Sequence, residues 1–240
     1  MVSSKMNLLK DREIVSFYSG HIGLIGGLAF RAGIFYYDQI LRHYNEAGKK
    51  LDLSIRHADV NTVLAHVGKG DPVGLGSYLS GLANELFDAG VDHVTVTAVA
   101  PHLAIDEISK NSNGPIVNLL ETVRPILNDL GLERVAIFGN RAVLLTDMFG
   151  AVPEKSVVKL NPDVLETVHE TYNDIALFGK RNTPVEVEYL NGVADNLMRQ
   201  GAQAIILAGT DLSSFYSEVP PEFPHIDMAK LHVEQILTRT

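Results

Sequence analysis

The sequence predicts an α/β protein made of two pseudo-symmetric, doubly wound Rossmann-like lobes, each with a parallel sheet, that face each other across a cleft. Two observations carry this prediction. Apolar segments typical of buried strands alternate with helical segments along the chain, as in proteins with parallel sheets. The pattern also repeats. Residues 94–102 and 205–213 are each predicted to begin as an apolar strand that ends abruptly, and each follows a helix that ends at a glycine.

The repeat has a consistent spacing. Aligning Gly90 with Gly201 gives an offset of 111 residues, and the segment 134–141 matches the first strand, 21–27, at an offset of 113. Two similar offsets at separate elements favour an internal duplication over chance resemblance. Because parallel sheets place their chemistry beyond the carboxyl ends of their strands, candidate site residues are sought there.

Composition limits the possible functions. The chain has 240 residues, of which 46% are hydrophobic, a net charge of −9 and no cysteine. The negative charge argues against nucleic acid and anionic membranes as partners, and no apolar run approaches the roughly 20 residues of a transmembrane helix. The N-terminus lacks the form of a signal peptide, so we expect a cytoplasmic protein. Without cysteine, disulfides, thiolate metal sites and thiol-based reactions are excluded.

The first lobe is expected over residues 21–115 together with residues 222–240, after an N-terminal extension at 1–20. Its strands are predicted at 21–27, 51–57 and 94–98, and its helices at 32–43, 76–89 and 103–109. The pair Gly26-Gly27 permits either a tight turn or an anion at the start of the next helix. No GxGxxG or Walker lysine accompanies it, so no dinucleotide or NTP site is predicted.

The second lobe is expected over residues 116–221 and repeats the same order of elements. Its strands are predicted within 134–141 and at 155–159 and 204–208, and its helices at 162–177 and 184–200. A proline-rich tail leads to a last helix, 228–237, that we expect to return to the first lobe. No metal site is predicted, because ligand spacing with carboxylates is lacking at His43, His66, His93, His169, His225 and His232.

Five short motifs follow one another along the two lobes. They are Ile-Gly-Leu-Ile-Gly-Gly at 22–27 with Tyr36-Tyr37 downstream, the strand end at 98–102, Pro-Ile-Val-Asn at 115–118, Ala-Ile-Ile-Leu-Ala-Gly-Thr-Asp at 204–211, and Ile226-Asp227 before a helix containing His232. Together they resemble the aspartate/glutamate racemase superfamily over nearly the whole chain from residue 21. The resemblance implies two Rossmann-like lobes, no cofactor, a small amino or carboxylic acid as substrate, and a homodimer.

The resemblance also implies two cysteines that face the substrate α-carbon from opposite sides. One thiolate removes the α-proton, and the other thiol delivers a proton to the opposite face. In this sequence the matching positions hold Ala98 and Gly209. Neither residue can carry a proton, so the two-thiol mechanism is unavailable and any chemistry must depend on other groups.

Two groups near these positions are candidates for proton transfer. His102 lies four residues beyond Ala98, on about the same face if a helix begins there, and an imidazole titrates near neutral pH. The alternative is the supporting role of the histidine in the family motif. Asp211 lies two residues beyond Gly209 and could act as a base or orient His102, the alternative being a helix N-cap.

Other residues at the strand ends are predicted to contact the substrate. Thr97 and Thr210 offer hydroxyl groups, and Arg141 either clamps a carboxylate or lies on the surface. His57 and Asp59 close the second strand and could line the same opening. The predicted substrate-binding set is Gly27, Leu28, Ala29, Thr97, Ala98, Val99, Ala100, Asn140, Arg141, Gly209 and Thr210.

A distal carboxylate on the substrate is not favoured. The resemblance implies an arginine for it in the loop after the second strand, where this sequence has Asn61, with Arg56 upstream. His21, which precedes the first strand, is predicted to be structural.

Two functions follow from these observations. The first is an isomerase, racemase or lyase that moves a proton without cysteine, since the superfamily includes decarboxylation and cis-trans isomerisation. The second is a non-catalytic homologue that binds or senses a small acid. Convergence of His102 and Asp211 across a pocket would favour the enzyme, whereas side chains directed into the core or solvent would favour the binding protein.

Overall fold

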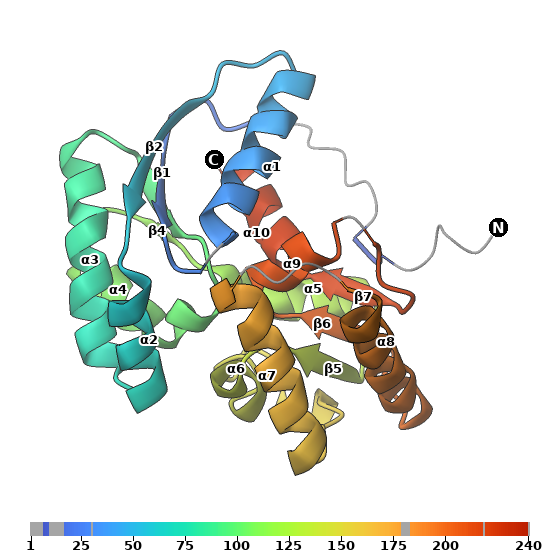
Figure 1. The fold of residues 1–240 in the computed structure, drawn as a ribbon. Coiled ribbons are helices and arrows are strands. Elements are labelled where there is room, and N and C mark those ends of the chain that lie inside the picture. Colours follow the sequence, from blue (N-terminus) through green and yellow to red (C-terminus); the bar gives the residue numbers. More distant parts are fainter. Residues whose placement is uncertain (1–6, 10–16, 30, 179–182, 218, 240) are drawn as a thin grey trace. The chain divides into compact units, whose positions relative to one another are not determined.

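Two parallel sheets organise the chain, one in each of two units (Figure 1). A computed structural model describes residues 7–9, 17–29, 31–178, 183–217 and 219–239. The chain divides after residues 12, 119 and 231. We call residues 13–119 with 232–240 the N-terminal unit, and residues 120–231 with 1–12 the C-terminal unit.

The N-terminal unit contains a four-stranded parallel sheet in the order β2-β1-β3-β4. Its strands are β1 (His21–Gly26), β2 (Asp52–His57), β3 (His93–Val96) and β4 (Ile116–Val117). The central strands β1 and β3 are almost wholly buried, as their apolar sequences predict. They pair from Ile22↔His93 to Ile25↔Val96, so their carboxyl ends lie side by side.

Helices cover both faces of this sheet, and Figure 1 shows α3 and α1 on opposite sides. The helices are α1 (Ala32–Glu46), α2 (Val60–Lys69), α3 (Pro72–Asp88), α4 (Ile105–Asn111) and the end of α10 (Met228–Leu237), with a 3-10 turn, η1 (Ala100–Ala104). Asp59 and Asp71 cap α2 and α3 with their carboxylates, and Gly70 takes a left-handed conformation between the two helices. Helix α2 was not predicted, although apolar residues recur in it at helical spacing, at positions 60, 63, 64 and 67.

The C-terminal unit contains a three-stranded parallel sheet in the order β5-β6-β7. Its strands are β5 (Val135–Phe138), β6 (Ala204–Leu207) and β7 (His225–Asp227), and all three are buried. The helices are α5 (Val123–Asp129), α6 (Arg141–Leu145), α7 (Pro162–Phe178), α8 (Pro184–Arg199) and α9 (Thr210–Phe215), with 3-10 turns η2 (Leu119–Thr122) and η3 (Glu154–Ser156).

The two sheets share one topology, which supports the internal duplication. Val157 forms a single parallel bridge with Val135 of β5 and thereby occupies the position that β2 has beside β1. With this bridge, the second sheet follows the order β2-β1-β3-β4 of the first. The predicted strand at 155–159 is therefore wrong as a full strand, because η3 takes up its first residues and one bridge replaces a ladder.

Strand pairing corrects the predicted lobe boundaries. Residues 116–117 form β4 beside β3 and belong to the N-terminal unit, not to the second lobe. β7 pairs with β6, so residues 222–231 belong to the C-terminal unit, and only the tail from residue 232 joins the other. Part of the expected extension also pairs, since Asn7 bridges His225; residues 1–6 and 10–16 lie outside the described residues.

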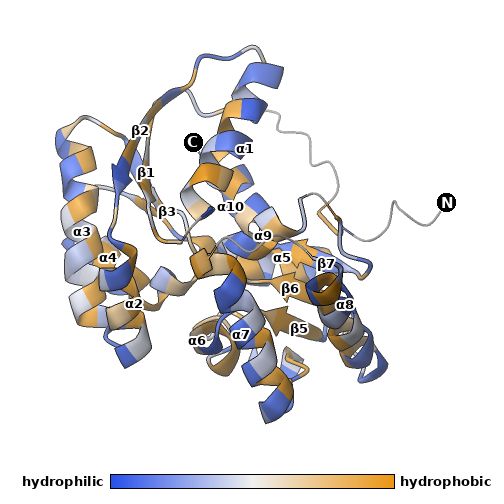
Figure 2. Ribbon diagram, viewed as in Figure 1, coloured by the Kyte–Doolittle hydropathy of each residue, from blue (hydrophilic) through white to orange (hydrophobic). Residues whose placement is uncertain are grey.

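Apolar residues concentrate on the strands and on one side of the amphipathic helices (Figure 2). Within the described part of the chain, no helix has the length and apolar character needed to span a membrane.

Two glycines of α3 test the packing of the N-terminal unit. A Cβ on Gly76 would lie 2.4 Å from the Glu107 Cβ, whereas one on Gly81 would have no atom within 4 Å. Gly76→Ala should therefore destabilise the protein by roughly 1–3 kcal/mol through overpacking against α4. Gly81→Ala, the matched control in the same helix, should stabilise it by about 0.5–1 kcal/mol. Urea unfolding measures both, and equal effects would contradict this close α3–α4 contact.

Candidate active site

Gly27 forms a tight turn at the end of β1. Its φ of 77° lies in the left-handed region that favours glycine. A Cβ there would lie 2.4 Å from the Ala58 carbonyl oxygen and 2.6 Å from the His57 ring. Because α1 begins only at Ala32, the glycine pair does not open a helix. The turn interpretation is therefore favoured over an anion site.

The end of β3 is closed to solvent. Thr97 donates its hydroxyl to the Ile25 carbonyl oxygen at 2.8 Å. Leu28 and Ala98 belong to the hydrophobic core of the N-terminal unit, and Val99 is buried. Any substrate contact at these three apolar positions would therefore come through the backbone. Partial exposure remains at Gly27, Ala29 and Ala100.

Charged and polar side chains along β2 are engaged locally. Arg56 forms an ion pair with Glu85 of α3, and Asp59 caps α2. His21 lies 2.9 Å from the Ser54 hydroxyl. These contacts agree with structural roles for all three side chains.

His102 is fixed by the backbone through both ring nitrogens. It is 1% exposed, its Nδ1 lies 2.9 Å from the Ala98 carbonyl oxygen, and the Leu119 N–H donates to Nε2 at 3.3 Å. A single neutral tautomer, with the proton on Nδ1, satisfies both contacts. Burial lowers the pKa of His102 to about 4, so the ring is neutral near pH 7. Proton transfer would first have to break one of these bonds, which favours the supporting role.

A second buried histidine continues this network. The His232 ring lies 5.6 Å from the His102 ring. Its Nε2 lies 3.3 Å from the Val117 carbonyl oxygen, and the Tyr36 hydroxyl lies 2.8 Å from its Nδ1. Burial, and then the neighbouring His102, lower the pKa of His232 well below its ordinary value. Two neutral histidines thus hold the segment 117–119 in place.

At the end of β5, Arg141, which was predicted to bind a substrate carboxylate, instead pairs with a carboxylate of the protein. Asn140 caps α6 by accepting from the Val143 N–H at 3.0 Å. The Arg141 guanidinium forms a two-point ion pair with Glu166 of α7, with Nε 3.0 Å from Oε1. The Arg141 backbone N–H donates to Nδ1 of His169 at 3.0 Å. Glu166 therefore lies where the clamp hypothesis puts a substrate carboxylate.

At the end of β6, Asp211 meets a tyrosine from α7. Asp211 is 2% exposed, and Thr210 is buried beside it. Gly209 is the N-cap of α9, so Asp211 is not the cap that the alternative interpretation assumed. The Tyr172 hydroxyl lies 3.5 Å from Asp211 Oδ2. A Cβ on Gly209 would lie 2.3 Å from Tyr172 Cε2, so the tyrosine ring fills the space that a side chain at 209 would need.

Helix α7 contributes side chains that were not predicted as site residues. Glu166, His169 and Tyr172 are spaced by three residues, which puts them on one face of the helix, toward the ends of β5 and β6. That spacing lies within the predicted helix 162–177 and was the available signal. His169 was considered only as a metal ligand. In the described part of the chain, no group of three or more His, Asp or Glu side chains is arranged to hold a metal ion.

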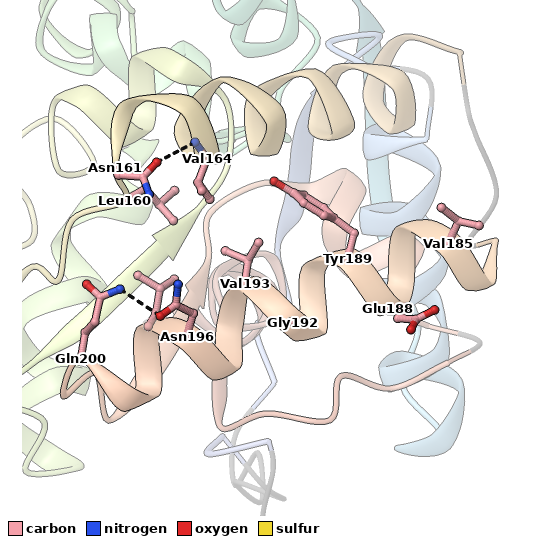
Figure 3. A pocket seen from close by; sticks show the side chains of 11 residues that line it. Leu160, Asn161, Val164, Val185, Glu188, Tyr189, Gly192, Val193, Asn196 and Gln200 are labelled. Atoms are coloured by element: carbon pink, nitrogen blue, oxygen red, sulfur yellow. Dashed lines mark hydrogen bonds between the residues drawn. The ribbon is translucent and has the colours of Figure 1, made fainter.

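A surface groove of about 420 Å³ lies between α7 and α8, away from the predicted site residues. Figure 3 shows Tyr189 and Val193 of α8 directed toward α7, with Asn196 and Gln200 at one end of the groove. A second pocket, of about 350 Å³, lies beside Glu166 and has Ile137 and Leu165 in its wall. Neither pocket is lined by His102, Asp211 or the predicted substrate-binding residues.

The model of the Asp/Glu/Hydantoin racemase family matches residues 25–236. The chain belongs to this family. Solved structures share its fold: a candidate Asp/Glu racemase from Yersinia pestis is 21% identical, with a TM-score of 0.73, covering 90% of this chain and 97% of its own. An aspartate racemase homologue from Pyrococcus horikoshii OT3 is also 21% identical, with a TM-score of 0.72 and the same coverage. For the aspartate racemase of Picrophilus torridus the identity is 16% and the TM-score 0.70, covering 89% and 91%.

No curated protein sequence matches the chain significantly. For this member of the Asp/Glu/Hydantoin racemase family, the fold agrees with the two parallel sheets that the sequence predicts. The two predicted proton-transfer residues are divided between the units, with His102 in the N-terminal and Asp211 in the C-terminal unit.

The buried histidine predicts an acid-sensitive fold. Because the pKa of His102 is about 4 in the folded state and about 6.5 in an unfolded chain, its neutral ring contributes stability fully above pH 6.5. That contribution falls as the pH drops from 6.5 to about 4, by up to about 3 kcal/mol in total. Urea unfolding of His102→Gln should show a flatter dependence of stability on pH in this window. The exposed His57→Asn is the control, and an unchanged slope in His102→Gln would contradict the prediction.

Proposed function

We propose that this chain is a cofactor-independent isomerase or lyase of the racemase family, which moves a proton at a carbon of a small amino or carboxylic acid without cysteine. One observation carries the proposal. A buried carboxylate, Asp211, follows the end of β6 and contacts the hydroxyl of Tyr172, at the position where this fold places its chemistry.

Asp211 is assigned the acid–base role. His102 is assigned a positioning role, because its two ring nitrogens hold the segment after β3 and residue 119. Thr97, Thr210 and the backbone at Gly27, Ala98 and Gly209 remain proposed substrate contacts. A homodimer and a cytoplasmic location also remain proposals, and sedimentation of the purified protein tests the first.

A non-catalytic small-acid-binding protein is the second candidate. Three observations favour it: the burial of both His102 and Asp211, backbone bonds at both nitrogens of His102, and the Tyr172 ring in the space of a side chain at 209. Such a protein would bind an acid and leave its carbon-bound protons unchanged.

Proton exchange separates the two candidates. Incubation in deuterated water with a panel of D- and L-amino acids and hydroxy acids should incorporate deuterium into at least one compound. Asp211→Asn should slow this exchange by about 10²–10⁴-fold, the usual contribution of an acid–base group. Asp195→Asn, an exposed position on α8, is the matched control, and His102→Gln, which removes a positioning group, should slow exchange less than Asp211→Asn does. Binding of an acid without any exchange would instead support the second candidate.

Arg141 is proposed to bind the carboxylate of the substrate in competition with Glu166. Arg141→Gln should weaken binding of the exchanging acid about tenfold, because a two-point charged contact is lost, and Glu166→Gln should strengthen it. Calorimetric titration measures both, with Arg199→Gln on α8 as the control. Weaker binding in Glu166→Gln would show that the ion pair only supports the fold.

A further inference from the structure

Tyr172 and a side chain at position 209 are mutually exclusive. The backbone of Gly209 is extended, with φ of −169°, so it places no restriction on residue type. The restriction is steric: a Cβ would lie 2.3 Å from Tyr172 Cε2 and 2.8 Å from its hydroxyl oxygen. The ring and hydroxyl of Tyr172 therefore occupy the volume that a side chain at position 209 would fill.

Asp211 and Tyr172, which lie side by side, differ in burial. Asp211 is 2% exposed, whereas Tyr172 keeps part of its surface exposed. That exposure belongs to the residue as a whole, since the phenol group itself is buried, and the aspartate lies next to the hydroxyl at 3.5 Å. In ligand-free enzymes, catalytic hydrogen bonds are often this long and shorten in the substrate complex.

The phenol is chemically suited to pass a proton on. Burial, and then the negative charge of Asp211, raise the pKa of Tyr172 well above 10, so the hydroxyl keeps its proton at neutral pH. A phenol in this state can donate to the carboxylate and accept at the same oxygen. Phenolate itself would be disfavoured beside a carboxylate.

α7 holds the tyrosine in place. Val168 and Ile175, one turn to each side, are buried in the core of the C-terminal unit. Between them, His169 accepts the Arg141 backbone N–H, which ties this turn of α7 to the end of β5. The ring therefore has little freedom to withdraw from Gly209.

We propose that the Tyr172 hydroxyl oxygen is the atom that exchanges the proton with the substrate, relaying it to and from Asp211. This inference rests on the proposed function and deepens it. As the substrate C–H bond breaks, its electron pair stays on the carbon and is delocalised into the adjacent carboxyl group. The proton forms an O–H bond with Tyr172 while the phenol proton moves to Asp211. In the return step Asp211 gives its proton back to the Tyr172 oxygen while that oxygen delivers a proton to the substrate, which gives exchange at the same carbon and a proton shift at a neighbouring one, so no other reactant is needed.

A double-mutant cycle tests the spatial claim without any substrate. Gly209→Ala should lower Tm in the wild-type background, because its methyl group meets the ring, and should not lower it in the Tyr172→Ala background. Additive shifts in Tm would overturn the claim that the two side chains share one volume.

Deuterium exchange with the same panel of acids tests the relay. Tyr172→Phe keeps the ring and should lose exchange by at least about 10²-fold, with unchanged affinity for the exchanging compound. Tyr189→Phe on α8 is the matched control and should exchange normally. The double variant Tyr172→Phe with Asp211→Asn should lose no more than either single variant, since the residues act as one unit.

The outcomes distinguish the relay from the proposed function. Exchange that is lost in Asp211→Asn but kept in Tyr172→Phe overturns the relay and leaves the proposed function standing. Additive losses in the double variant also overturn the relay. A wild-type protein that exchanges no compound of the panel overturns the proposed function and the relay with it.

Discussion

The backbone ladder of each parallel sheet is the constraint on which the rest of the structure depends, because it continues beyond the ends of the strands. The Thr97 N–H bonds the Ile25 carbonyl oxygen at 3.2 Å, and the Ala208 N–H bonds the Phe138 carbonyl oxygen at 2.8 Å. Buried backbone hydrogen bonds are costly to leave unmade, so the residues that follow them are fixed by the sheet. These backbone bonds do not depend on which side chains stand at 98 and 209, so the fold can persist while its chemistry changes.

The two duplicated positions have been filled in different ways. Ala98 joins the hydrophobic core of its unit, so packing continues through the position. At Gly209 the space that a side chain would need is occupied by Tyr172, which comes from a different helix. The residue type at position 98 is enough to predict its apolar packing, whereas the glycine at 209 does not indicate that a tyrosine from α7 lies beside it. Under the proposed relay, the functional group at this position belongs to a residue 37 positions earlier in the chain.

The features that the sequence predicts well are those encoded locally. The buried strands β1, β3, β5 and β6 and the helices α7 and α8 follow from apolar runs and helical spacing, and the repeat offset agrees with the shared sheet order. Unit boundaries were misplaced because β4 and β7 are two and three residues long, and only their pairing partners assign them. The roles of His102 and Arg141 depend on Leu119 and Glu166, which are distant in sequence and brought close by tertiary packing.

The ionisable groups of the candidate site are unevenly distributed between the duplicated halves, and this bears on the reaction. After β3, His102 is neutral and bonded to the backbone at both nitrogens. After β6, Tyr172 and Asp211 are in contact and would act as one acid–base unit. Inversion by two bases requires independent groups on opposite faces of the carbon. Under the proposed function, a single linked pair instead fits reactions that need one acid–base unit. Examples are a proton shift, which removes and returns a proton, and an elimination, which removes a proton as a leaving group departs. The two halves would then share one sheet topology, while the groups that transfer the proton would come only from the C-terminal unit.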